Sequence, residues 1–198
     1  GSSEDLAGLL GKNVSFVPIR IERKISIKDD VFVLIKLWLF FRKEKFDCVY
    51  SIMPKAGLLS MLASYFAGIP IRICVFNGEV WANKTGFMRS FLKLVDKVTA
   101  RCATIVLAVG PSQRKILIDN NIVKEHKVHV IADGSIAGVK IERFSYNADA
   151  HYQIRLQNKI PEDAIVFLFV GRLSHDKGLL DLSRAFSEAA EQDPKIHL

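Results

Sequence analysis

Short apolar runs alternate with longer amphipathic blocks along most of the chain. The runs are rich in β-branched residues and predict strands at 14–19, 47–52, 71–76, 104–109 and 127–132. The blocks between them predict helices at 30–45, 57–67, 86–101 and 112–120. Strands this uniformly apolar are typical of a parallel sheet that helices cover on both faces. We therefore expect a doubly wound, Rossmann-like α/β domain.

A polar segment at 133–160 interrupts this alternation and contains one short predicted helix near 151–156. A new unit follows, with a strand at 165–170, a helix at 177–191 and a final apolar run. Two strands and one helix are too few to bury a parallel sheet. We predict an N-terminal domain over 1–132, an interdomain connection over 133–160, and the truncated start of a second Rossmann-like domain over 161–198.

The composition is that of an ordinary globular protein, with 49% hydrophobic and 25% charged residues. A net charge of +7 favours anionic partners such as phosphates, nucleic acid or an anionic membrane face. Cys48, Cys74 and Cys102 lie far apart in apolar runs, which predicts reduced core residues of a cytosolic protein. Residues 1–13 lack the features of a signal peptide, and the longest apolar run, at 31–41, is too short to span a bilayer.

The stretch FLFVGRLSHDKG places a glycine and two cations beyond the predicted strand at 165–170. Ligands of open α/β sheets bind at this carboxyl edge. Gly171 permits close backbone approach, the following helix offers free N–H groups, and Arg172 and Lys177 suit phosphate. These features predict a diphosphate site, with a solvated turn as the alternative. The patterns of a P-loop and of GxGxxG are both absent from the sequence, so neither a kinase nor a dehydrogenase is supported.

Three other segments follow predicted strands at the same kind of edge. Lys55 and Gly57 either contact acceptor or donor phosphates or form a tight turn with one exposed lysine. In the stretch FNGE, the carboxylate either contacts a sugar or is a charge at a helix N-terminus; these candidates are Asn77, Gly78 and Glu79. Gly134 and Ser135 either line a cleft between domains or form a simple turn. The five histidines lack metal-site spacing, and no metal site is predicted.

The predicted helix at 86–101 has a basic residue at every fourth position beside a neighbouring set of apolar residues. The basic residues are Arg89, Lys93, Lys97 and Arg101. Such a helix either lies on an anionic membrane or packs on the sheet with a solvated basic edge. A nucleic-acid recognition pattern is absent from the sequence, so no nucleic-acid partner is predicted.

The stretch VGRLSHDKGLLDLSRAF resembles the start of the nucleotide-binding domain in retaining glycosyltransferases of family four, which have the two-domain GT-B fold. The resemblance continues upstream through ERKIS, MPKAGLLSMLAS, AGIPIRI, FNGE and DGSIAGVKIERF, and so covers nearly the whole chain. The PKAG and GS..GV..ERF blocks are similar to bacterial members that build capsule, O-antigen or related surface glycans.

This resemblance implies hexosyl or N-acetylhexosaminyl transfer from a nucleotide diphosphate sugar, with a UDP-sugar expected. The acceptor is a glycan or a polyprenyl-linked sugar, the anomeric configuration is retained, and no cofactor is needed. Arg172 and Lys177 then hold the diphosphate and neutralise its growing charge as it leaves. Family members often have histidine in place of Asn77, whose amide hydrogen-bonds a hydroxyl but cannot shuttle protons.

The resemblance also implies parts outside this sequence, including a first strand before residue 1, so we expect the chain alone to be poorly active. It predicts a cytoplasmic protein that is peripheral at the inner face of the cell membrane. The alternative from another class is a noncatalytic module that binds a phosphorylated ligand or tethers a membrane complex. Neither the acceptor and linkage nor the oligomeric state follows from the sequence.

Overall fold

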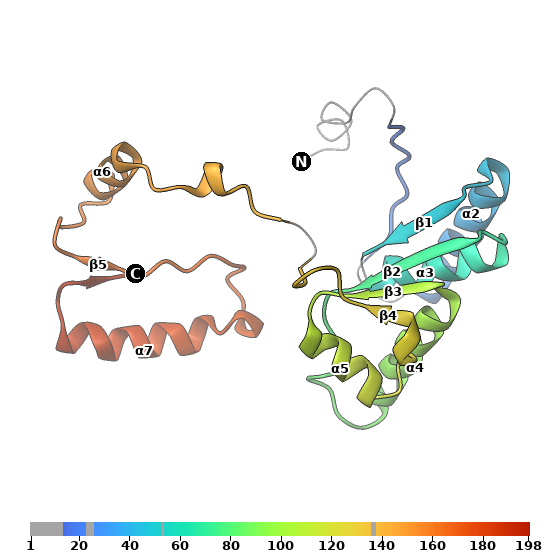
Figure 1. The fold of residues 1–198 in the computed structure, drawn as a ribbon. Coiled ribbons are helices and arrows are strands. Elements are labelled where there is room, and N and C mark those ends of the chain that lie inside the picture. The colour runs from blue at the N-terminus through green and yellow to red at the C-terminus, as the bar shows by residue number, and fades with distance from the viewer. Residues whose placement is uncertain (1–13, 23–25, 53, 136–137) are drawn as a thin grey trace. The chain divides into compact units, whose positions relative to one another are not determined.

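The structure is a computed structural model that describes residues 14–22, 26–52, 54–135 and 138–198. Its chain forms two compact units, Gly1–Gly138 and Val139–Leu198, and each is described by itself (Figure 1). The signal-peptide prediction for residues 1–13 lies outside the described residues. The three-part domain division made from the sequence stays a prediction.

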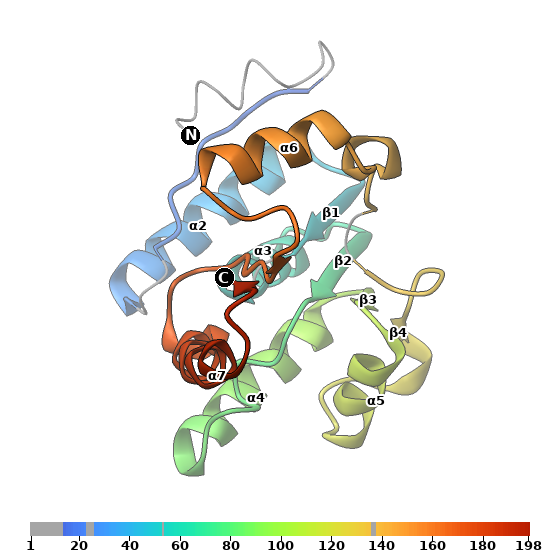
Figure 2. The same ribbon diagram turned by 90° about the vertical axis from the view of Figure 1, so that its left-hand side faces the viewer.

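The first unit contains a four-stranded parallel sheet in the order β1-β2-β3-β4. Its strands are β1 (Cys48–Ser51), β2 (Ile71–Phe76), β3 (Ile105–Ala108) and β4 (Val128–His129). Its helices are α2 (Ile27–Glu44), α3 (Pro54–Phe66), α4 (Gly86–Cys102), α5 (Pro111–Asp119) and the short η1 (Glu125–Lys127). Since neighbouring strands are consecutive in the chain, right-handed crossovers place α3, α4 and α5 on one face of the sheet, with α2 packed on α3 (Figures 1 and 2).

Burial in the sheet follows from this arrangement. Val49 and Val106 are buried under the helices, whereas Tyr50, on the other face of the sheet, is half exposed. The expected burial of the strands on both faces is therefore met only in part within the described residues. The core between the sheet and the helices is completed by Met61, Trp81 and Leu117, each at most 2% exposed.

Three predictions in this unit need correction. The run at 14–19 has no helix or strand, and its Val14 and Phe16 are exposed, because no strand of the described sheet pairs with it. Helix α3 begins at Pro54 rather than at residue 57, since proline, which lacks an N–H, fits a first helical position. Cys48 is exposed and so is not a core residue, although Cys74 and Cys102 are buried and all three thiols are free.

The second unit contains α6 (Ala148–Gln157), α7 (Leu179–Gln192), and the two short parallel strands β5 (Ile165–Val166) and β6 (Ile196–His197). The single-turn helices η2 (Ile141–Phe144) and η3 (His175–Lys177) precede α6 and α7. The strand predicted at 165–170 is shorter than expected, because β6 pairs with it over two positions and the last backbone hydrogen bond between them runs from the Phe167 N–H to the His197 carbonyl at 2.8 Å. Across the described residues, every helix is too short or too polar to cross a membrane.

Candidate functional site

The loops that follow β2, β3 and β4 meet at the carboxyl edge of the four-stranded sheet. Asn77, Gly78 and Glu79 follow β2 directly, so the predicted FNGE candidates do lie at this edge. Asn77 is exposed, and Gly78 has a φ of 149°, a conformation that side-chain-bearing residues rarely adopt. The turn at Gly78 brings the Glu79 carboxylate back toward the start of α5.

Gln113, on the first turn of α5, holds the Glu79 carboxylate in place. Its amide nitrogen donates a hydrogen bond to Glu79 Oε1 at 2.9 Å, and its amide oxygen accepts one from the Val109 N–H at 2.8 Å. The Gln113 side chain is buried, so each of these groups replaces a lost bond to water. The sequence reasoning missed Gln113, because nothing in the local pattern distinguishes it from an exposed helix residue.

The Val109 peptide also fixes the loop that follows β4. Its carbonyl accepts a hydrogen bond from the Ser135 N–H at 2.7 Å. Gly134 has a φ of 105°, and a Cβ there would lie 2.4 Å from the Val109 oxygen, so only glycine fits this close approach. Both Gly134 and Ser135 line a cavity of about 260 Å³ together with Tyr50. The structure therefore joins the FNGE and DGS segments through Val109 and Gln113.

A second carboxylate, Asp96 of α4, lies close behind the FNGE turn. It lines a small cavity of about 20 Å³ with Asn77 and Gly78, and its Oδ2 accepts a hydrogen bond from Trp81 Nε1 at 2.8 Å. Burial raises the pKa of Asp96 to about 6; the Trp81 hydrogen bond opposes this shift, and the nearby Glu79 charge adds to it. Asp96 is the single acidic residue in the sequence of α4, on its core-facing side. A lone acid on the core-facing side of a helix could have indicated this buried carboxylate from the sequence.

We expect Asp96→Asn to raise the free energy of unfolding at neutral pH by about 1–2 kcal/mol, after allowance for solvent screening. The amide oxygen still accepts the Trp81 hydrogen bond, while the cost of burying a charge is removed. With a folded pKa of about 6 against an ordinary 3.8, the folded state binds more protons between these values, so wild-type stability falls as the pH rises through this window. Urea unfolding near pH 4 and near pH 7 measures the slope.

Asp119→Asn is the matched control for this measurement, because Asp119 is an exposed acid at the end of α5. We expect the control to keep the wild-type pH slope, whereas Asp96→Asn loses part of it. Identical slopes for wild type and Asp96→Asn would contradict the assignment of a raised pKa to this carboxyl group.

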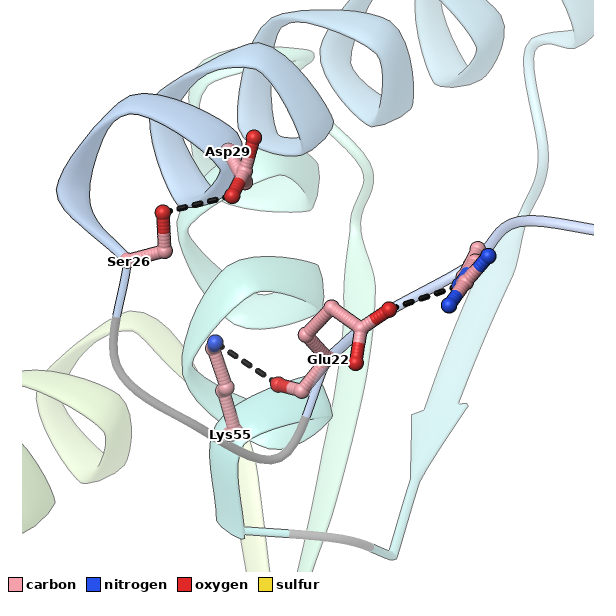
Figure 3. A network of polar contacts seen from close by, with 5 residues as sticks. Glu22, Ser26, Asp29 and Lys55 are labelled. Atoms are coloured by element: carbon pink, nitrogen blue, oxygen red, sulfur yellow. Dashed lines mark hydrogen bonds and ion pairs between the residues drawn. The ribbon is translucent and has the colours of Figure 1, made fainter.

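The structure gives Lys55 and Gly57 structural contacts. The Lys55 ammonium forms an ion pair with Asp30 Oδ1 at 2.6 Å. It also donates a hydrogen bond to the Glu22 carbonyl at 2.7 Å (Figure 3). A Cβ at Gly57 would lie 3.4 Å from Cys74 Sγ, so the close approach at this glycine is made by the helix to the sheet. Gly57 is buried in α3, and its predicted place on the substrate side stays a prediction. A phosphate-binding role for Lys55 stays a prediction.

The predicted diphosphate loop belongs to the second unit. The Ser174 N–H donates a hydrogen bond to the Arg172 carbonyl at 2.9 Å, and the Lys177 N–H donates one to the Ser174 carbonyl at 3.0 Å. The chain therefore turns tightly between the two cations. The side chains of Arg172 and Lys177 are exposed, and Gly171 precedes them. Within the described part of the chain, the buried Ser174 hydroxyl has no hydrogen-bond partner. Helix α7 begins two residues after Lys177.

The four basic residues predicted for the membrane divide into two pairs. Arg89 and Lys93 lie over the Trp81 ring, at 5.9 and 4.8 Å from its centroid, and Lys93 also donates a hydrogen bond to Asn120 Oδ1 at 2.7 Å. Lys97 and Arg101 are exposed further along α4. The membrane-facing role of all four stays a prediction, and the geometry favours the second pair.

The histidines, cysteines and acids of the described residues form no cluster of three or more that could hold a metal ion. The chemistry available at the edge of the first sheet is that of an exposed amide, a held carboxylate and backbone groups. The second unit contributes two exposed cations and a buried hydroxyl. The groups of the first unit suit a polar ligand with hydroxyls, and the cations of the second unit, taken by itself, suit an anionic ligand.

The sequence matches the model of Glycosyltransferase Family 4 over residues 3–134, which is most of the first unit. The chain belongs to glycosyltransferase family 4. This membership confirms the resemblance that was first seen in the sequence motifs.

Two curated relatives are glycosyltransferases by name, and the name of the first places it in capsular polysaccharide biosynthesis. The chain is 34% identical over 168 residues to the capsular polysaccharide biosynthesis glycosyltransferase CapM of Staphylococcus aureus, covering 85% of this chain and 44% of CapM. It is 31% identical over 180 residues to the UDP-Gal:alpha-D-GlcNAc-diphosphoundecaprenol alpha-1,3-galactosyltransferase of Escherichia coli, covering 89% and 43% of the two proteins. The chain thus spans less than half the length of these relatives.

Solved structures show the same fold. Anabaena Alr3699/HepE, in complex with UDP and glucose, superposes with a TM-score of 0.65 at 17% identity, covering 88% of this chain and 44% of that one. A glycosyltransferase from Rickettsia africae superposes with a TM-score of 0.59 at 18% identity over the same shares. These likenesses confirm the predicted GT-B type, Rossmann-like α/β fold class.

Proposed function

We propose that the protein is a glycosyltransferase that moves a sugar from a nucleotide diphosphate sugar to a glycan or lipid-linked acceptor in bacterial surface-polysaccharide synthesis. The observation that carries this proposal is the family 4 match over residues 3–134. The name of the Staphylococcus aureus relative supports the polysaccharide setting, and the name of the Escherichia coli relative supports a lipid-linked acceptor. The chain covers 44% of the Staphylococcus aureus relative and 43% of the Escherichia coli relative, so it corresponds to part of such an enzyme.

The proposed donor is a UDP-sugar bound at the loop from Gly171 to Lys177. The E. coli relative is named for UDP-Gal, and the solved relatives include complexes with UDP and UDP-glucose. Arg172 offers a forked donor and Lys177 a compact charge to the two phosphates, and the unpartnered Ser174 hydroxyl adds a third donor. These cations offset the charge that grows on the leaving diphosphate, and the proposal includes no metal.

The proposed acceptor and sugar side is the edge formed by Asn77, Gly78 and Glu79. The exposed Asn77 amide both donates and accepts hydrogen bonds, as sugar hydroxyls require. Gln113 donates its hydrogen bond to Glu79 Oε1, so the other carboxylate oxygen can accept a hydrogen bond from a sugar hydroxyl. The proposed reaction retains the anomeric configuration.

The proposed location is the inner face of the cell membrane, where the protein is peripheral. A lipid-linked acceptor, as in the name of the E. coli relative, would lie in that membrane. The exposed pair Lys97 and Arg101 on α4 supports contact with anionic lipid.

The test is a transfer assay with the purified full-length protein and a panel of nucleotide sugars, including UDP-galactose and UDP-glucose. The acceptor is a sugar linked to a polyprenyl diphosphate, and NMR of the product reports the anomeric configuration. We expect release of UDP that depends on the acceptor, with retention. If the protein binds a nucleotide sugar but shows no transfer and no hydrolysis across the panel, it is instead a noncatalytic binding module.

A further inference from the structure

A groove of about 850 Å³ lies between the second half of α4 and the segment 118–127 that leads into β4. The basic residues in its lining are Lys97, Arg101, Lys124, His126 and Lys127. Because Arg101 comes just before β3 and Lys127 just before β4, the groove lies at the amino-terminal edge of the sheet. The proposed sugar site is at the opposite, carboxyl edge, so the groove is separate from it.

The charges of this groove are poorly compensated within the described residues. Glu125 is the one carboxylate among the lining residues, and it already pairs with Arg114 at 3.1 Å. The Lys127 ammonium donates a hydrogen bond to the Arg101 carbonyl at 3.2 Å. Burial lowers the pKa of Lys127, and the nearby Arg72 and Arg101 charges lower it further. Positive charges lie close together in this groove, and a bound anion would reduce the repulsion between them.

An exposed apolar stripe runs along α4 beside the groove. Phe87, Phe91, Leu94 and Val98 are 82%, 41%, 58% and 36% exposed and lie at spacings of four, three and four residues. This spacing places them on one helix face, whereas the buried Thr99 and Ala100 lie on another. Lys97 and Arg101 lie beside the stripe and also line the groove. The cationic groove and the apolar stripe are therefore continuous.

We propose that the groove binds the phosphate headgroup of an anionic phospholipid while the α4 stripe enters the adjoining lipid interface. The proposal rests on the proposed function, because it gives that membrane-associated enzyme its docking surface. A free phosphate would use the groove and leave the stripe exposed to water. A nucleic acid would likewise gain nothing from four exposed apolar side chains on one helix face. A ligand that is both anionic and apolar uses both features.

The experiment is co-sedimentation of the full-length protein with vesicles of phosphatidylcholine, with and without phosphatidylglycerol. We expect binding to require phosphatidylglycerol. The double variant Lys97→Gln, Lys124→Gln removes two exposed charges from the groove and is expected to lower the partition coefficient roughly 20- to 30-fold. The control Lys43→Gln, Lys115→Gln removes two exposed lysines on α2 and α5, which do not line the groove, and is expected to bind within about twofold of wild type. Equal losses in both would show that net charge alone drives binding, which overturns the site.

A second variant tests the stripe. Phe87→Ser, Leu94→Ser changes two exposed side chains and is expected to reduce binding to the same anionic vesicles at least tenfold. Inorganic phosphate is expected not to displace the wild-type protein at near-physiological ionic strength. If phosphate displaces it fully and the stripe variant binds like wild type, the ligand is a soluble phosphate and the lipid proposal fails.

Transfer activity of the unsubstituted protein in detergent is measured separately. Absence of transfer there would reject the proposed function and leave the vesicle result standing. Normal transfer together with no preference for anionic vesicles would reject the docking surface and leave the proposed function standing.

Discussion

Replacing Arg172 or Lys177 with alanine is expected to lower kcat about 10²- to 10³-fold, with a smaller change in the KM for the nucleotide sugar. Both side chains are exposed on the loop before α7, where the chain turns tightly around Ser174. The charge on the departing diphosphate grows as the sugar bond breaks. Cations aimed at it therefore stabilise the transition state more than the bound donor. Steady-state kinetics with varied donor separates the two parameters.

Arg172→Lys keeps the charge and removes the forked donor, so we expect it to fall between wild type and Arg172→Ala. Lys140→Ala is the control, because it removes one exposed cation of the same unit outside the loop. A noncatalytic module would keep its partner and its location in all of these variants. Unchanged kcat in both alanine variants would reject the assignment of this loop to the leaving group.

An apolar run forms a strand of the predicted length where neighbouring strands of the sheet pair with it along that length. The run at 71–76 forms β2 over its full length, because β1 and β3 pair with it on either side. The runs at 127–132 and 165–170 form strands of only two residues, since each finds a single partner over two positions. An apolar run indicates that a segment can be buried, but the length of the strand depends on the strands that pair with it.

The candidate site was partly predictable for a similar reason. Asn77, Gly78 and Glu79 were identified because they follow a strand, and their position in the chain fixes them at the sheet edge. Gln113 was not, because its function in holding Glu79 arises between residues 34 apart in sequence. Lys55 was identified as a cation that follows a predicted strand, but its ion pair with Asp30 depends on how α2 packs on α3. Side-chain partners set by packing between helices are outside the reach of local patterns.

Gly134→Ala is expected to lower the free energy of unfolding by about 2–4 kcal/mol, because it combines backbone strain with a direct clash. The φ of 105° is unfavourable for alanine, and the new Cβ would lie 2.4 Å from the Val109 oxygen, which is too rigid to move away. Relieving the clash breaks the Ser135 hydrogen bond to that oxygen and shifts the peptide that Gln113 holds. Gly138→Ala is the control, since nothing lies within 4 Å of a Cβ there and its φ is not positive. Urea unfolding compares the two variants, and equal midpoints would show that the approach of Gly134 to Val109 is not what fixes this loop.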